Sequence, residues 1–173
     1  SNISTISNVA QFTISTWINA GTIAGSDKEI FTTADSTSES IVLNLFNADL
    51  ILGVGTTSQF NRYNSAVVAN QWYHLAVVKN GSNCAVYLNG VSIATFTAAT
   101  IACPASPTNY IGIFNVSYPM LGYISNLRIV NGTAVYTSAF TPSAQPLTAI
   151  ANTSLLTLQY NGGATNQGII DNS

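Results

Sequence analysis

The acidic residues are the first to consider, because a glycosidase cleaves a glycosidic bond with a pair of carboxyl groups. Retaining enzymes hold the two groups about 5–5.5 Å apart and inverting enzymes about 6.5–9.5 Å apart. The chain has six acidic residues: Asp27, Glu29, Asp35, Glu39, Asp49 and Asp171. No strand shows the Glu-x-Asp-x-x-Glu pattern of a sandwich glucanase. Asp27 and Glu29 can share a face, but Lys28 and the nearby glycines favour a solvent-exposed strand start. The sequence therefore predicts that the chain is not an enzyme.

Histidine and cysteine offer little more chemistry. His74 is the only histidine, and it lies inside an apolar run. A hydrogen-bonded structural role is a simpler interpretation there than a nucleophile–base pair with Cys84 or a serine. Cys84 and Cys103, with one histidine, lack the ligand spacing of a zinc site. Two cysteines are too few for a disulfide framework, and whether they pair is left open.

The composition excludes several classes of function. Charged residues make up 6% of the 173 residues, against about 25% in an average domain. The net charge of −2 provides no basic face for nucleic acid. No stretch approaches the roughly 20 apolar residues of a membrane span, so membrane insertion is not expected. Residues 1–173 are expected to form one domain. The start at Ser1, without Met, favours a processed product or part of a longer chain.

Short strands separated by turns must position any site. Three apolar runs, 72–79, 84–88 and 91–96, are joined by Asn80-Gly81 and Asn89-Gly90, the strongest short-range hairpin signal. They predict a three-stranded meander that a second sheet must cover. Further strands are expected at 11–19, 29–33, 40–46, 49–56, 110–114 and 120–130. Together they predict an all-β, two-sheet antiparallel sandwich or jelly roll.

Some residues have specific structural roles in this prediction. Trp17 and Trp72 are expected to be largely buried in the core, on different strands. Gly90 is expected to need a positive φ, which a β-branched residue resists. Leu121, Tyr123, Ser125, Leu127 and Ile129 should share one face. Residues 155–159 and 169–170 should form a last strand pair.

Several motifs resemble a known family when taken in order. They are FTISTW at 12–17, WYHLA at 72–76, VYLNG at 86–90, YIG at 110–112 and GYISNLRI at 122–129. They resemble a laminin G-like jelly roll of the concanavalin A-like superfamily over residues 11–130. The tail at 122–142, with PLT at 146–148 and TSLLT at 153–157, resembles domains of marine bacteriophage tail fibres and other virion appendages. Such domains usually have one more strand before Ser1, which suggests a truncated start or a strand supplied by another part of the polypeptide.

This resemblance implies two kinds of ligand. Lectins of this architecture combine an aromatic platform with amides and hydroxyls, which makes the loop aromatics Phe60, Tyr63, Tyr118 and Tyr136 candidates for glycan binding. For each, packing against the strands or a neighbouring subunit is the alternative. Calcium is the metal to consider, with Asp27, Asp35 and Glu39 as ligands. No dense Asp-x-Asp loop supports it, so no cofactor is the simpler expectation.

The leading interpretation is a non-enzymatic module of a virion surface, such as a tail-fibre or capsid-decoration domain, that recognises host glycans. A free carbohydrate-binding lectin is the alternative, and an inactive or unrecognised glycosidase relative is the third. Residues 1–10 and 162–173 carry one charge between them, Asp171, so both ends are poorly protected against pairing with another chain. The expected partners are copies of the chain, other virion proteins and cell-surface polysaccharide.

Overall fold

The computed structural model describes residues 9–34, 39–54, 60–63, 67–98, 108–114, 117–159 and 170–173. Within these residues the chain forms eleven strands and no helix, and hence no helix that could span a bilayer. The strands are β1 (Gln11–Ala20), β2 (Lys28–Ala34), β3 (Glu39–Phe46), β4 (Asp49–Val54), β5 (Phe60–Tyr63), β6 (Trp72–Asn80), β7 (Asn83–Leu88), β8 (Val91–Thr97), β9 (Thr108–Ile111), β10 (Gly122–Asn131) and β11 (Thr153–Thr157).

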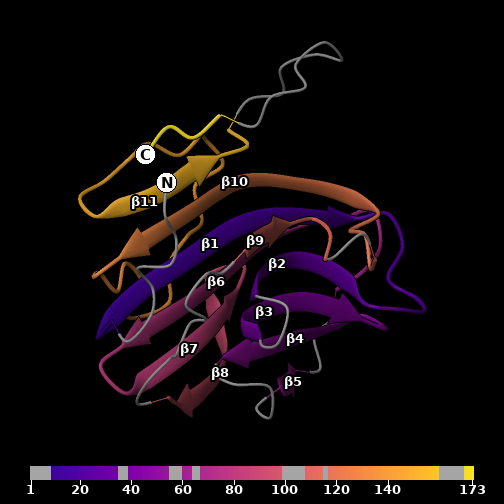
Figure 1. Cartoon of the computed structure of the whole chain (residues 1–173), viewed down its shortest axis with the longest axis horizontal. Coiled ribbons are helices and arrows are strands. Elements are labelled where there is room, and N and C mark those ends of the chain that lie inside the picture. Colours follow the sequence, from indigo (N-terminus) through magenta and orange to yellow (C-terminus); the bar gives the residue numbers. More distant parts are fainter. Residues whose placement is uncertain are drawn as a thin grey trace.

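The strands form two stacked antiparallel sheets, as predicted (Figure 1). One sheet has six strands in the order β11-β10-β1-β6-β7-β8, and the other has five in the order β5-β4-β3-β2-β9. β1 is paired on both sides, with β6 and with β10. β1 therefore lies in the interior of the six-stranded sheet, and side chains on both of its faces are packed against other residues.

The meander and its turns are confirmed. β6, β7 and β8 pair antiparallel, and Asn89 and Gly90 both have positive φ, 50° and 80°. The carbonyl oxygen of the Asn89 side chain accepts a hydrogen bond from the His74 backbone N–H (2.8 Å). The hairpin between β3 and β4 turns at Asn47 and Ala48, which also have positive φ. Local turn chemistry thus favours the β7–β8 hairpin, whereas Ala48 in the β3–β4 turn takes a conformation that alanine rarely adopts.

The core lies between the two sheets. Alternate residues of β1, namely Phe12, Ile14 and Ile18, face it, as do alternate residues of β3 and β4 from the opposite sheet. The two-residue period that predicted strand 11–19 is therefore present in the structure. The other face of β1 points away from this core.

A second, smaller cluster covers the outer face of the six-stranded sheet. Residues 132–150, which we call the strap, cross this face after β10. Tyr136 and Phe140 of the strap pack against Ala76, Val78 and Tyr87. Thr13 Oγ1 donates to the Thr133 carbonyl oxygen (3.0 Å), and the Phe140 N–H donates to the Gly90 carbonyl oxygen (3.0 Å). This covering explains why β6 is buried on both faces from Tyr73 to Lys79.

The predicted burial of Trp72 is wrong. Trp17 and Trp72 do lie on different strands, but Trp17 is only half-buried, and Trp72 is 47% exposed. Trp72 is the first residue of β6 and is paired with Asn19, on the outer face of the sheet. The core side of β6 is taken by Tyr73, Leu75 and Val77 instead. A tryptophan inside an apolar run is therefore placed by strand parity rather than by its own hydrophobicity.

The predicted common face of β10 is also wrong, because a β-bulge interrupts the strand. Ser15 pairs with Arg128 but Trp17 pairs with Ser125, so β10 has one extra residue. Asn126, in the bulge, has a φ of 53°. Leu127 and Ile129 face the core, whereas Leu121 and Tyr123 are exposed. A bulge of this kind changes which face the following residues present.

The predicted strand pair of β11 with residues 169–170 is only partly within the described residues, because residue 169 lies outside them and residue 170 belongs to no strand. β11 pairs with β10, which supplies Leu127 to Val130 as partners. Residues 170–173 contact β11 through two hydrogen bonds instead: the Asn172 N–H donates to the Leu156 carbonyl oxygen (2.7 Å), and the Leu156 N–H donates to Asp171 Oδ1 (3.1 Å).

Candidate functional site

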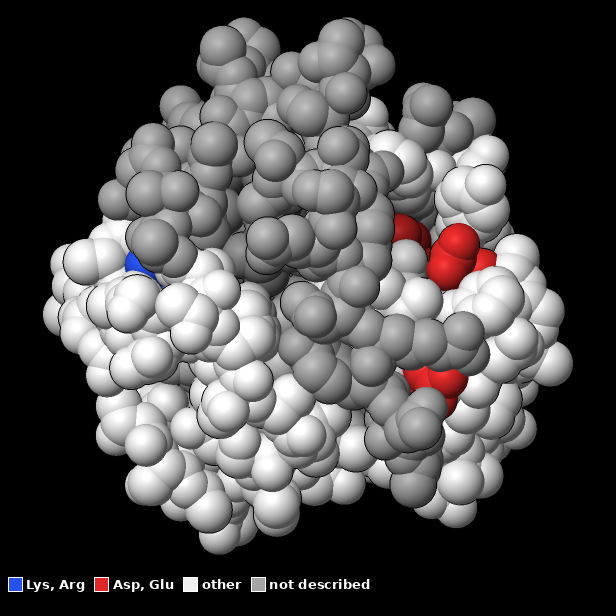
Figure 2. Space-filling view, turned by 90° about the horizontal axis from the view of Figure 1, so that it is seen from below, with Lys and Arg blue, Asp and Glu red and all other residues white. Residues whose placement is uncertain are grey.

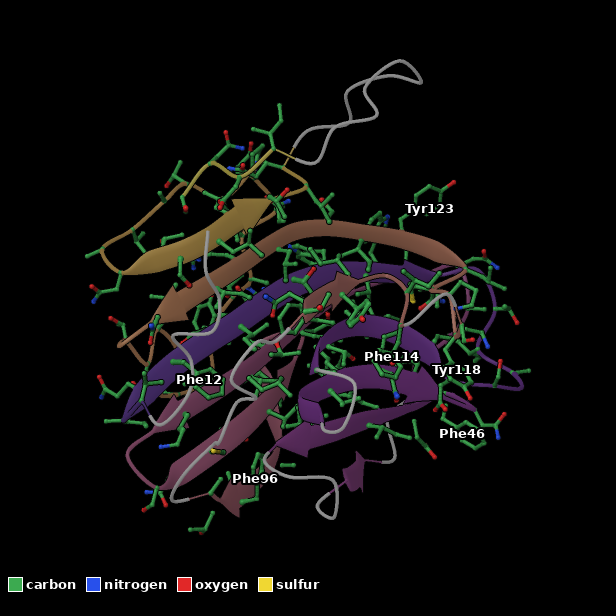
Figure 3. The ribbon with its side chains drawn as sticks, in the orientation of Figure 1. Phe12, Phe46, Phe96, Phe114, Tyr118 and Tyr123 are labelled. Carbon is green, nitrogen blue, oxygen red and sulfur yellow. The ribbon has the colours of Figure 1, made fainter. Side chains whose placement is uncertain are left out.

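A depression of about 290 Å³ lies on the outer face of the five-stranded sheet. We call it the Tyr118 groove. The described residues that line it are Asp27, Glu29, Val42, Asn44, Ile51, Phe114 and Tyr118. Figure 3 shows Phe114 and Tyr118 on the same side of the molecule, by β2 to β4. The groove thus combines aromatic, aliphatic and polar side chains.

Strand register brings the floor of the groove together. Glu29 of β2 pairs with Asn44 of β3, and Asn44 pairs with Ile51 of β4, so the three form one row across the sheet. Their neighbours Ile30, Leu43 and Leu45 point the other way, into the core. Because successive residues of a strand alternate between faces, the row Glu29–Asn44–Ile51 must face outward.

A short loop after β9 builds the aromatic side. Phe114 and Ser117 exchange two backbone hydrogen bonds (3.0 and 2.7 Å), and the Glu29 N–H donates to the Tyr118 carbonyl oxygen (3.0 Å). Tyr118 has a φ of 57°, an uncommon conformation for a residue with a side chain. Tyr118 is 45% exposed. The loop is therefore tied to β2 while it presents an aromatic ring to solvent.

Two buried polar groups lie beneath these rings. Glu29 is only 2% exposed, and its Oε1 accepts a hydrogen bond from Thr32 Oγ1. Asn44 is 7% exposed, and its Oδ1 has no hydrogen-bond partner within the described part of the chain. A buried carbonyl oxygen without a partner costs about 1–3 kcal/mol. This oxygen is itself closed off from solvent, so a donor from outside the chain reaches it only after the Asn44 side chain turns toward the groove.

The comparison with sequence families decides what kind of domain carries this groove. The family described as the concanavalin A-like lectin/glucanases superfamily, of laminin G-like type, matches residues 1–139. The chain belongs to this superfamily. A search of curated proteins finds no significant match.

Solved structures support the fold of this laminin G-like domain. A protein from Bacteroides ovatus assigned as carbohydrate-binding is 20% identical, with a TM-score of 0.68; the match covers 95% of this chain and 50% of that one. Domain 4 of an extracellular arabinanase from Geobacillus stearothermophilus, in complex with arabinotriose, is 21% identical, with a TM-score of 0.59; the match covers 78% of this chain and 67% of that one. A sialidase CBM40 from Ruminococcus gnavus, bound to α2,3-sialyllactose, is 16% identical, with a TM-score of 0.57; the match covers 66% of this chain and 72% of that one.

The structure separates the aromatic residues that the sequence grouped as glycan-binding candidates. Tyr118 lines the groove. Tyr136 lies in the strap on the outer face of the opposite sheet, stacked on Phe140 with a ring-centroid distance of 3.7 Å. Phe60 and Tyr63 are the ends of β5, and their side chains lie outside the described part of the structure. Only Tyr118 is thus placed at this site.

Tyr136 borders a second depression, of about 660 Å³, between the strap and β7 and β8. Its described lining includes Tyr87, Phe96 and hydroxyl or amide side chains such as Asn83 and Thr95. No side-chain oxygen or nitrogen of its described lining residues is buried without a hydrogen-bond partner. For this reason the Tyr118 groove is the stronger candidate site.

The calcium set Asp27, Asp35 and Glu39 is only partly placed. Asp27 lines the groove, Asp35 lies outside the described residues, and Glu39 begins β3 with its side chain outside them. Among the described residues, no three His, Cys, Asp or Glu side chains are grouped to hold a metal ion. The calcium hypothesis therefore remains a prediction.

His74 has a structural environment, but the predicted hydrogen bonding of its ring is not found at Nδ1, which is buried without a hydrogen-bond partner among the described residues. His74 is 2% exposed, and its ring contacts the rings of Trp17, Tyr136 and Phe140 at centroid distances of 5.3, 6.2 and 5.5 Å. Burial, and secondarily the positive charge of Arg128, lowers its pKa to about 4. Cys84, a buried free thiol, packs in the core on the other face of the sheet. A His74–Cys84 catalytic pair is therefore excluded.

Most of the groove is not predicted from the sequence. The predicted solvent-exposed strand start at Lys28 and Glu29 is wrong, because both side chains are buried. Lys28 Nζ donates to the carbonyl oxygens of Ala24 (3.2 Å) and Ser26 (2.6 Å), which satisfies its charge within its own loop. Asn44 carried one usable signal: a polar residue between Leu43 and Leu45 marks the outer face of a strand.

Proposed function

We propose that the chain is a non-catalytic glycan-binding module that holds a sugar in the Tyr118 groove. The unpartnered Asn44 Oδ1, beside the buried Glu29, is the observation that carries this proposal. A sugar hydroxyl group is a donor for Asn44 Oδ1 once that side chain turns toward the groove. Tyr118 and Phe114 supply apolar surface for the carbon–hydrogen face of the ring. The fold is shared with proteins solved in complex with arabinotriose and sialyllactose, which is consistent with this use.

The finer context we propose is a virion surface, where the module would be part of a tail fibre or decorate a capsid. Support comes from the sequence motifs that resemble phage appendage domains and from the scarcity of charge. In the described part of the face in Figure 2, few charged side chains are visible, and the acidic ones lie on one side. Partners would be copies of the chain, other virion proteins and host polysaccharide. A free lectin, which would bind glycan as a monomer, is the alternative.

The groove can be tested by removing its two distinctive features. Tyr118→Ala and Asn44→Leu are each expected to weaken glycan affinity at least tenfold, or about 1.4 kcal/mol. Asn44→Leu should leave the melting temperature unchanged or raise it, because it removes an unpartnered polar group. An array of neutral, amino and acidic oligosaccharides would identify the ligand, and calorimetry would measure the affinity. Ile113→Ala is the matched control, since Ile113 is exposed beside Phe114 but does not line the groove. Unchanged affinity in both groove variants would refute the site.

Hydrolysis is expected to be absent. Incubation with laminarin, agarose, alginate and cell-wall polysaccharides should release no reducing ends, because Glu29 is occupied by Thr32 and its carboxyl group is buried. Glycosidases need one carboxyl group as acid and another as base or nucleophile. Turnover that is lost in Glu29→Gln or Glu39→Gln would show that the module is an enzyme.

A further inference from the structure

Two exposed aromatic side chains lie in one row at an end of the six-stranded sheet. Asn19 of β1 pairs with Trp72 of β6 on one side and with Tyr123 of β10 on the other. Trp72 is 47% exposed and Tyr123 is 69% exposed. Their ring centroids are 6.3 Å apart and the ring planes are inclined by 34°. The two rings therefore lean toward each other across the strand that carries Asn19.

The strap ends short of this row. One step along the strands, Trp17 and His74 are covered: Trp17 Nε1 donates to the Ser143 carbonyl oxygen (3.0 Å), and His74 packs against Tyr136 and Phe140. Trp72 and Tyr123 have no such covering and remain open to solvent. Figure 3 shows Tyr123 projecting away from the ribbon, well apart from Phe114 and Tyr118. The row is thus a surface separate from the Tyr118 groove.

The backbone beneath the row is held in place. The Gly21 N–H donates to the Leu121 carbonyl oxygen (2.7 Å), and the Asn70 N–H donates to the Ala20 carbonyl oxygen (2.7 Å). Gly122 has no room for a Cβ, which would overlap the Asn19 carbonyl oxygen. The three strand ends are therefore closely joined, so the two rings are presented by a rigid support. Pre-organisation of this kind lowers the entropic cost of binding.

The chemistry of this surface is aromatic and uncharged. None of residues 17–23, 67–73 and 119–125, which make up this end of the three strands, is charged at pH 7. Half-exposed Trp and Tyr offer roughly 200–300 Å² together, since each ring buries about 150–250 Å² when fully covered. A standard protein interface needs about 800 Å² from each partner. The area suits one or two sugar rings better than a protein surface.

We propose that Trp72, Tyr123 and Asn19 form a second carbohydrate-binding platform, for the apolar face of a neutral pyranose in an extended polysaccharide. The rings stack against the carbon–hydrogen face of the sugar, and the Asn19 amide bonds to a hydroxyl group at its edge. Because no charge takes part, binding is insensitive to salt, and anionic glycans gain nothing. The platform does not depend on the Tyr118 groove, and the two can hold separate segments of one polysaccharide.

Tryptophan fluorescence tests this directly, because the chain has only two tryptophans. In a Trp17→Phe background Trp72 is the sole emitter. Titration with cellohexaose or laminarihexaose should give a saturable blue shift, equal at 0.05 and 0.5 M salt. In the wild type, the indole N–H signal of Trp72 should shift in NMR spectra while that of Trp17 stays. This second measurement holds even if the Trp17 variant fails to fold.

Variants separate the platform from the groove. Tyr123→Ala and Trp72→Ala should each weaken the binding of these neutral hexaoses at the platform at least tenfold. Binding to Trp72→Ala is measured by calorimetry, because this variant has lost the fluorescent residue. Tyr118→Ala should leave the Trp72 response unchanged. The absence of a Trp72 response to either hexaose at millimolar concentration would overturn the platform. A response only to sialyllactose or alginate oligomers would also overturn it. So would self-association that disappears in Trp72→Ala without any sugar response, which would identify a protein contact instead.

Discussion

Replacing Gly90 with valine is expected to lower the free energy of unfolding by about 3–5 kcal/mol. The residue has a φ of +80°, which costs an L-residue about 1–2 kcal/mol, more if it is β-branched. A Cβ would also overlap the carbonyl oxygen of Phe140 and crowd Pro142, so the strap must move away from the sheet. Overpacking of this kind typically costs about 1–3 kcal/mol. Urea unfolding at constant slope would measure the loss.

The other Asn-Gly turn, Asn80-Gly81, provides a matched control. Gly81 also has a positive φ, 64°, but nothing lies within 4 Å of where its Cβ would be. Gly81→Val should therefore lower the free energy of unfolding only by the cost of the positive φ, without any steric overlap. Gly90→Ala, a smaller change, keeps the test informative if Gly90→Val fails to fold. Equal losses at the two glycines would show that the strap does not rest on the β7–β8 turn.

Acidification from pH 7 to pH 4 is expected to remove about 3 kcal/mol of stability through His74 alone. Its pKa is about 4 in the fold and 6.5 in the unfolded chain. Between these values the unfolded state binds more protons, so stability falls as the pH falls below about 6.5 and levels off below about 4. The cause is burial among aromatic rings, with the Arg128 charge adding to it.

His74→Phe isolates this contribution, because phenylalanine keeps an aromatic ring in the cluster and does not titrate. Stability should be measured by denaturant unfolding at intervals from pH 7 to pH 4. Carboxyl groups titrate over part of this range in both proteins, so the difference between the two curves belongs to His74. Parallel curves, or an imidazole that titrates near pH 6.5 by NMR, would contradict the buried, neutral state.

The groove and the platform were beyond sequence reasoning because each needs three strands in register. Asn44 and Ile51 meet across the local β3–β4 hairpin, but Glu29 joins them only through the pairing of β2 with β3. Trp72 and Tyr123 meet only through β1. The bulge at Asn126 further changed which β10 residues face outward. A shift of one residue in register reverses every face, so such sites depend on long-range pairing.

The sequence by itself determined the local turns and the alternation of the strands. Asn89-Gly90 forms the turn that its residue types favour, and the apolar runs of β6, β7 and β8 form the meander. Asn47-Ala48 also turns the chain, although alanine rarely takes a φ of 70°. Together with the ordered motifs, these features indicated the two-sheet sandwich. Only the tertiary structure decided which residues were covered, because burial depends on what packs on top. The strap buries His74 and stops before Trp72, and no property of either residue in the sequence foretells that boundary.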